Sequence, residues 1–183
     1  GETGYSHFIT WNRNKYMGQD YMRQQFHWNY YYGFLGSVNS VIRAIDEESA
    51  AAGPLAYLAS ALAYRAMLYL DLARMYEFLP NDIYTEGKNN EGNTVLNLTV
   101  PIVHENTTEA DAKFNPRATR EEMYNFILSD LNKAEKYIVN LTNTSSNTMP
   151  DLACVYGLKA RLYMWVEDYA NAQDYARKAI DAA

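Results

Sequence analysis

The chain has 183 residues, of which 48% are hydrophobic and 21% charged, with a formal net charge of −6. These values are typical of one globular domain with a real core and exclude general disorder. Nucleic acids and anionic membrane surfaces reward clustered Lys and Arg, so the acidic balance argues against both as partners. No apolar run approaches the roughly 18 residues of a membrane-spanning helix. We therefore expect one globular domain with no nucleic-acid partner.

Residues 1–19 are rich in aromatic and polar side chains but lack helical periodicity, so they are interpreted as a loop. An exposed aromatic ring can stack against the C–H face of a sugar while nearby amides bind its hydroxyls. The candidate ligand-binding residues of the chain are therefore Tyr5, Phe8, Trp11 and Asn14. The alternative is that these aromatic side chains pack the loop onto the following helix.

Two long helices are predicted within residues 20–80. In the first, apolar residues recur at steps of three and four until about Asp46, at Trp28, Tyr31, Leu35, Val38, Ile42 and Ile45. Pro54 fits the first helical position of the second helix, and Pro80 is expected to stop that helix. Its apolar positions are Leu55, Leu58, Leu62, Ala66, Tyr69, Ala73 and Tyr76.

Residues 81–118 interrupt the helical pattern. They contain a turn cluster at 89–93 and then an alternation of apolar residues at Leu96, Leu98, Val100 and Ile102. Pro101 limits this alternating run to an edge strand or an extended loop. A connection this long is uncommon unless it has a function or packs on something.

The third long helix is expected to begin at Thr119, which forms a capping box with Glu122. Its apolar positions are Met123, Ile127, Leu131, Ala134 and Ile138. This helix and the second one are interpreted as a hairpin that the 81–118 insertion opens. A polar linker of Asn, Thr and Ser follows at residues 140–148.

A 34-residue helical-repeat pattern begins at Tyr156. The small residues that let two helices approach fall on Ala160, Ala172 and Ala179, and the aromatic positions on Tyr156, Tyr163 and Tyr169. The turn is expected near Glu167 and Asp168, with Asp168 capping the last helix. A plain helical hairpin is the alternative. The predicted fold is all-α: a tetratricopeptide-like solenoid of helical hairpins, with a long irregular insertion between the second and third long helices.

Motifs for catalysis or metal binding are not found in the sequence. The acidic run at 46–48 is interpreted as a solvated helix end, because neighbours in sequence do not face one another on a helix. Cys154, the single cysteine, shares an apolar stripe with Leu158 and Leu162 and is expected to be a small buried hydrophobe. We expect no catalytic residue, no cofactor and no metal site, because the histidines are isolated at His7, His27 and His104.

Several stretches, in order, resemble the SusD/RagB family of outer-membrane nutrient-binding lipoproteins. They cover nearly all of residues 28–183, and their most characteristic segments are Trp28–Tyr31, Val38–Ile42, Tyr64–Leu72, Val100–Ile102, Arg117–Tyr124, Leu158–Tyr163 and Tyr169–Ala172. Glu77–Pro80 departs from the glycine-containing turn that is usual in the family. The resemblance also implies that the lipid-bearing N-terminal cysteine and the C-terminal half are missing here, so 1–183 is one helical-repeat domain of a longer protein.

The resemblance implies a lipid-anchored protein on the outer face of a Gram-negative outer membrane, seated on a SusC-like TonB-dependent transporter. Such a protein captures oligosaccharides, or in some members peptides, and delivers them without catalysis. In the family, aromatic residues ahead of the first long helix contribute to the glycan site, and Trp11 and Asn14 occupy that place. We expect a neutral ligand because no basic cluster is present. The alternatives are a helical-repeat adaptor that binds a peptide or partner protein and, less favoured, an all-α hydrolase.

Overall fold

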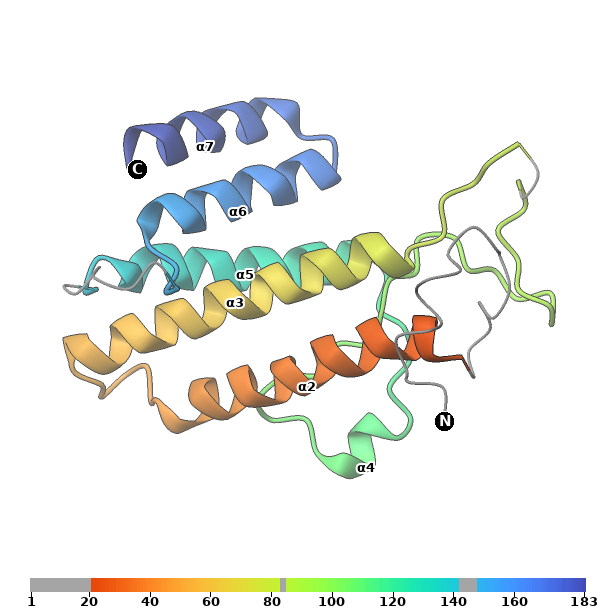
Figure 1. Cartoon of the computed structure of the whole chain (residues 1–183), viewed down its shortest axis with the longest axis horizontal. Helices are drawn as coiled ribbons and strands as arrows, with labels where there is room; N and C mark the ends of the chain where they lie inside the picture. Colours follow the sequence, from red (N-terminus) through yellow and green to blue (C-terminus); the bar gives the residue numbers. More distant parts are fainter. Residues whose placement is uncertain (1–20, 83–84, 142–147) are drawn as a thin grey trace, which may run out of the picture.

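The computed structural model describes residues 21–82, 85–141 and 148–183, without the side chains of residues 23 and 24. The described ranges contain two isolated β-bridges but no β-strand, so the predicted all-α class is confirmed. None of the described helices is both long and apolar enough to span a bilayer. The helices, drawn in Figure 1, are α2 (Met22–Ala44), α3 (Ala52–Tyr76), α4 (Glu109–Ala112), α5 (Arg120–Ile138), α6 (Leu152–Trp165) and α7 (Tyr169–Asp181).

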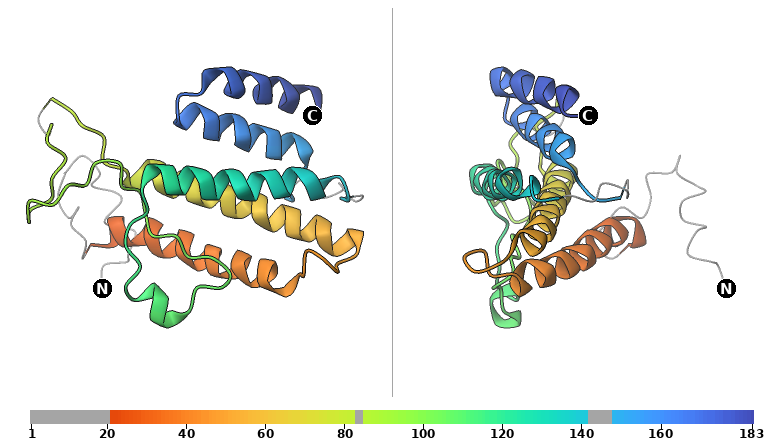
Figure 2. Two further views of the ribbon diagram at one scale, coloured as in Figure 1. Left: turned by 180° about the vertical axis from the view of Figure 1, so that it is seen from behind. Right: turned by 90° about the vertical axis from the view of Figure 1, so that its left-hand side faces the viewer.

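The long helices stack as successive pairs. Helices α3 and α5 run side by side in opposite directions in both Figure 1 and the rear view of Figure 2, although the insertion separates them in sequence. Helices α6 and α7 form the next hairpin, and α2 packs against α3 on the other side. The predicted hairpin between the second and third long helices is therefore present, and the tetratricopeptide-like arrangement is confirmed.

The ends of α3 differ from the prediction. The helix begins at Ala52, so Pro54 is its third residue and not its first. Proline is tolerated at this position because it has no N–H group, and the first four N–H groups of a helix have no acceptor within the helix. The helix ends at Tyr76, four residues before Pro80, where Arg117 Nη2 donates to the Tyr76 carbonyl at 2.8 Å.

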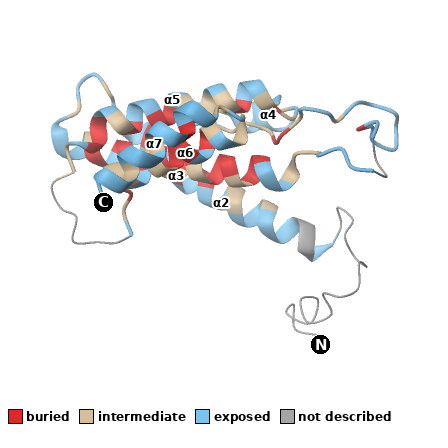
Figure 3. Ribbon diagram, turned by 90° about the horizontal axis from the view of Figure 1, so that it is seen from above, coloured by how far each residue is buried: buried red, intermediate tan, exposed pale blue. Residues whose placement is uncertain are grey.

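The core lies mainly between α3, α5 and α6, where Figure 3 shows the buried residues. The predicted capping box of α5 is present: Thr119 accepts from the Glu122 N–H, and Glu122 accepts from the Thr119 N–H. All five apolar positions predicted for α5 are buried, namely Met123, Ile127, Leu131, Ala134 and Ile138.

The insertion packs on the helices as an extended segment. No strand is assigned over residues 96–102, so of the two predicted alternatives this run is the extended loop; its burial does not alternate, because Thr99 and Val100 are both fully buried. Its main chain is bound by helix side chains, since the Tyr32 hydroxyl of α2 donates to the Pro101 carbonyl at 2.6 Å. The short helix α4, which the sequence pattern did not predict, opens with a capping box of its own. We call the extended segment at residues 98–105, which precedes α4, the strap.

The α6–α7 hairpin follows the repeat pattern closely. Ala160 and Ala172 are buried between the two helices, where small side chains allow close approach. Asp168 caps α7 by accepting from the Asn171 N–H at 3.2 Å.

The prediction for Cys154 is wrong, because this side chain is exposed. The predicted Leu158 and Leu162 are buried, but the third member of the buried stripe of α6 is Val155 and not its neighbour Cys154. Both sets match a helical period, since spacings of three and of four residues lie on nearly the same face.

Candidate functional site

The residues predicted to bind ligand lie in the N-terminal segment. Tyr5, Phe8, Trp11 and Asn14 are outside the described residues, so the structure neither brings them together nor separates them. Within the described part of the chain, we consider one cleft formed by two adjoining cavities, one further cavity and one buried polar network.

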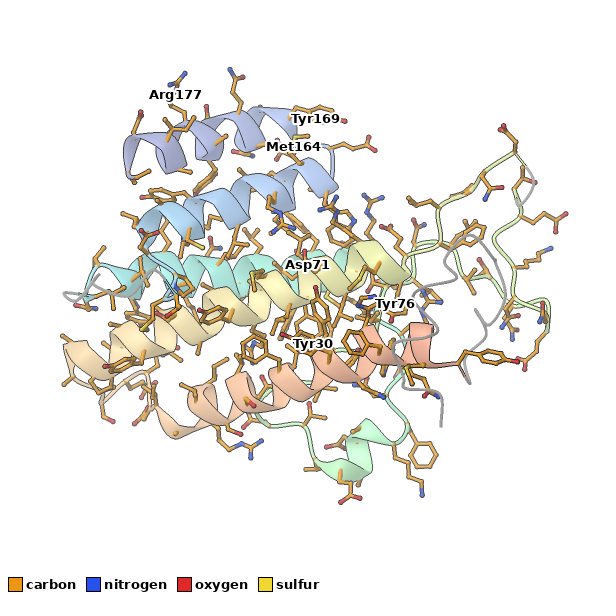
Figure 4. The ribbon with its side chains drawn as sticks, in the orientation of Figure 1. Tyr30, Asp71, Tyr76, Met164, Tyr169 and Arg177 are labelled. Carbon is orange, nitrogen blue, oxygen red and sulfur yellow. The ribbon has the colours of Figure 1, made fainter. Side chains whose placement is uncertain are left out.

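The first cavity, of about 640 Å³, crosses α3 and α6, and two of its lining residues, Asp71 and Met164, are labelled in Figure 4. It is lined by Tyr31, Asp71, Arg74, Met75, Glu77, Leu79, Arg120, Met164 and Trp165. A neighbouring cavity of about 480 Å³ shares three of these residues and continues toward Tyr169 on α7. We call the combined groove the α3–α6 cleft.

Most polar side chains of the α3–α6 cleft are paired with one another. Arg161 donates to Asp71 at 2.7 Å, and the Trp165 indole N–H donates to Glu77 at 2.9 Å. The guanidinium of Arg74 has neither a hydrogen bond nor an ion pair to any described residue. Met164 is 56% exposed. Surfaces rich in Met, Arg, Tyr and Trp are typical of the cores of protein–protein interfaces.

The second cavity, of about 670 Å³, lies at the N-terminal end of α5, beside the turn between α6 and α7. We call it the turn cavity; its lining residues are Asn97, Thr119, Arg120, Glu121, Tyr124, Val166 and Glu167. The Arg120 guanidinium is bound by the Trp165 carbonyl and lies 3.4 Å from a Glu77 carboxylate oxygen. This cavity therefore combines one aromatic ring with several short polar groups.

A buried ion network centres on Arg65, whose side chain is 4% exposed. Its guanidinium donates two hydrogen bonds to Asp130, at 2.7 and 2.8 Å, and others to Asn39 and Glu105. Burial alone would lower the pKa of Arg65, but its bonds with Asp130 and Glu105 outweigh burial and raise it. The network joins α2, α3 and α5 to the strap, and because every group in it is partnered, its role is structural.

The acidic run after α2 is not a catalytic pair. Asp46 accepts from Ser49 and from the Glu48 N–H, which lowers its pKa. Glu47 instead accepts from Lys133 at 2.6 Å and from the Tyr137 hydroxyl at 2.7 Å, so it ties the end of α2 to α5. Asp46 and Glu48 are exposed, as predicted for a solvated helix end, and Glu47 is half-buried because it bonds to α5.

Metal ligands do not converge within the described ranges. No three His, Cys, Asp or Glu side chains there are grouped so that they could hold an ion. His27 and His104 are both exposed, while His7 belongs to the segment outside the description.

The stacked helical hairpins and their strap define a tetratricopeptide-like scaffold, and comparison with known proteins identifies its family. The SusD-like family model, described as starch-binding and associating with the outer membrane, matches residues 3–164. This match covers most of the chain, which therefore belongs to the SusD-like family.

Individual relatives agree in fold but are much longer than this chain. A SusD-like protein of Formosa agariphila is 26% identical over 79% of this chain and 24% of its own length. A SusD-like carbohydrate-binding protein of Bacteroides vulgatus superposes with a TM-score of 0.67 at 23% identity, over 85% of this chain and 31% of that one. A laminarin-binding SusD-like protein gives a TM-score of 0.56 at 18% identity, over 81% and 28%. The chain thus spans about a quarter to a third of these relatives.

Proposed function

We propose that this chain is the helical-repeat part of a non-catalytic protein that captures neutral oligosaccharides and delivers them to a SusC-like TonB-dependent transporter. The observation that carries the proposal is the family match, which covers residues 3–164 and is described as starch-binding and outer-membrane-associated. The names of two structural relatives, one carbohydrate-binding and one laminarin-binding, support the same class of ligand. The proposed location is the outer surface of the outer membrane, through a lipid anchor.

The neutral character of the ligand is proposed from charge. The chain carries a net charge of −6, and most cations of the described clefts are already paired with carboxylates. An anionic polysaccharide would meet repulsion from such a surface, whereas starch and laminarin are uncharged glucans. Trp11 and Asn14, with Tyr5 and Phe8, remain the proposed stacking and hydrogen-bonding residues of the N-terminal loop.

The α3–α6 cleft is the surface that we assign to the transporter. Its exposed Met75, Met164 and Tyr169, together with the unpaired Arg74, have the composition of a protein interface. Reversing the apolar character with Met164→Asp should weaken binding to the purified transporter while leaving glycan affinity unchanged. Loss of glycan affinity with transporter binding intact would contradict this assignment.

The alternative, an adaptor that binds a peptide, is less well supported. The strap already occupies the surface of α2 and α3 where an extended peptide could bind. The strap is held against α2 and α3 through its carbonyl groups, by Tyr32, Asn39, Arg43 and Tyr69. An extended peptide bound by a helical repeat would use such main-chain contacts. High-affinity binding of a peptide, with no glycan bound, would favour the adaptor over the proposed function.

The test is calorimetry and a glycan array on this chain and on Trp11→Ala. Binding of a neutral glycan that weakens by about 1–3 kcal/mol in Trp11→Ala, the scale of one lost aromatic stack, would support capture through the N-terminal loop. Measurable hydrolysis of any glycoside would instead establish an enzyme. Absence of binding to every neutral glycan would contradict the proposed function.

A further inference from the structure

The turn between α6 and α7 contains a residue in an unfavourable backbone conformation. Glu167 has a φ of 64°, in the left-handed region where residues other than glycine are uncommon. The Glu167 N–H donates to the Met164 carbonyl at 3.2 Å, and the Asp168 N–H to the Tyr163 carbonyl at 2.9 Å. This pair of bonds is the Schellman helix ending, whose left-handed position is usually glycine. A glutamate there requires an explanation, because glycine would fold more easily.

The second non-glycine residue with positive φ among those described is Asn97, with a φ of 58°. Its carbonyl accepts from the Arg120 N–H at 2.7 Å, which fixes this bend of the insertion to the first turn of α5. Asn97 and Glu167 both line the turn cavity, although they are seventy positions apart in sequence. Asparagine adopts this region more readily than most residues, so the strain lies mainly at Glu167, and backbone strain concentrates at functional sites.

The side chains of the turn cavity are suited to sugar hydroxyls. Asn97, Glu121 and Glu167 are exposed, and their side chains form no hydrogen bond or ion pair with any described residue. The Tyr124 ring is half-buried and meets Tyr163 edge-on, with centroids 6.5 Å apart. Amide and carboxylate groups accept hydrogen bonds from hydroxyls, and an aromatic face stacks on a pyranose ring.

The charge of the cavity restricts the ligand further. Two carboxylates, Glu121 and Glu167, remain free, while the Arg120 guanidinium is engaged by Glu77 and Trp165. An anionic sugar would therefore be repelled, and a neutral one would find acceptors for its hydroxyls. The volume of about 670 Å³ lies within the range of small-molecule sites and can hold a short oligosaccharide segment.

We infer that the turn cavity is a binding subsite for neutral oligosaccharides, in which Glu167 and Asn97 hold sugar hydroxyls beside Tyr124. This inference rests on the proposed function, and it adds a site built from the helical repeat to the proposed N-terminal loop. Glu167 is retained in a glycine position because its carboxylate contacts the ligand.

The Glu167→Gly variant distinguishes a loss of ligand affinity from a loss of folding stability. This substitution removes the carboxylate and relieves the left-handed strain, so Tm should stay unchanged or rise while affinity falls about tenfold, as for one lost hydrogen bond to a charged group. Loss of affinity in a variant at least as stable as the parent cannot come from misfolding. Glu167→Gln keeps a hydrogen-bonding side chain and should retain most of the affinity. Glu86→Gly, at an exposed position outside the cavity, is the matched control.

The probes are maltooligosaccharides and laminarin oligosaccharides, titrated by calorimetry into the parent chain, the three variants and Trp11→Ala. A tenfold loss in Glu167→Gly but not in Glu86→Gly supports the subsite. Equal affinity of the parent and Glu167→Gly overturns the subsite and leaves the proposed function standing, especially if Trp11→Ala still weakens binding. Absence of binding by the parent to both series overturns both proposals.

Discussion

Arg65 of α3 and Asp130 of α5 face each other in the core through two hydrogen bonds, Nε to Oδ2 at 2.7 Å and Nη2 to Oδ1 at 2.8 Å. Both side chains are about 95% buried. The Phe126 ring lies 4.9 Å from the guanidinium carbon, so one face of Arg65 is covered as well. This pair fixes the register of α3 against α5 more specifically than the surrounding apolar contacts can, because two parallel bonds allow only one alignment.

Asp130→Ala should destabilise the fold by about 3 kcal/mol, because it leaves the Arg65 guanidinium buried with only part of its partners. Asn39 and Glu105 would remain, so the loss should fall at the lower end of the range for broken buried pairs. Urea denaturation measures the free energy of unfolding directly. Asp174→Ala, at an exposed position on α7, is the control and should change it by less than about 0.5 kcal/mol. If both substitutions changed the free energy of unfolding by the same amount, the Arg65–Asp130 pair would not stabilise the fold as proposed.

The hydroxyl of Tyr69 holds the strap in place. It accepts from the Val103 N–H at 2.7 Å and donates to the Val103 carbonyl at 2.8 Å. Tyr69→Phe preserves the fully buried ring but leaves the Val103 N–H without this acceptor, which should cost about 1–3 kcal/mol. Hydrogen exchange should also become faster at Val103. Tyr57→Phe, at a residue that is 58% exposed, should leave both measurements unchanged. Unaltered exchange at Val103 in Tyr69→Phe would contradict this role.

The parts of the fold that were predictable have short-range signals. The capping box of Thr119 with Glu122 involves residues three apart, and the alanines of α6 and α7 fall at fixed offsets in one repeat. These signals follow from helix geometry, so they survive without knowledge of the tertiary structure. Cys154 shows the limit of this reasoning, because Cys154 and Val155 lie four and three residues before Leu158 and both spacings fit one helix face.

The groups that sequence reasoning missed are joined over long distances. Arg65 and Asp130 are 65 positions apart, and Asp71 and Arg161 are 90 apart, so no local pattern marks either pair. The turn cavity was missed because its residues come from the insertion, α5 and the α6–α7 turn. One sequence signal was available: Val166 and Glu167 follow the end of α6 at Trp165, without the glycine that usually follows a helix. Because the turn was predicted near Glu167 and Asp168, the missing glycine marks Glu167 as an unusual residue of that turn.

Ala172 tests the close approach of α6 and α7. Its side chain is 4% exposed at the position where the repeat pattern requires a small residue. Ala172→Leu inserts three extra carbons into a closely packed helix pair, which should destabilise the fold by about 1–3 kcal/mol. Ala170→Leu, two positions away at an exposed site of the same helix, should be nearly neutral. Thermal unfolding of both variants makes the comparison, and equal Tm values would mean that α7 is free to move away from α6.

The stability of the fold should depend on pH through Glu105, which bonds to Arg65 from the strap. Burial raises the pKa of Glu105, but the hydrogen bond from Arg65, a backbone hydrogen bond and the positive charge of Arg65 together outweigh burial and hold the pKa below its ordinary value of 4.5. A depressed pKa means that the unfolded chain takes up the proton more readily than the folded one. The stabilisation by this carboxylate is therefore complete above about pH 4.5 and is lost as the pH falls through the folded pKa. Glu105→Gln removes this ionisation, so its free energy of unfolding should fall less steeply than that of the parent over the same acidic range. Urea denaturation at a series of pH values compares the two slopes, and parallel curves would show that Glu105 does not contribute to the acid sensitivity.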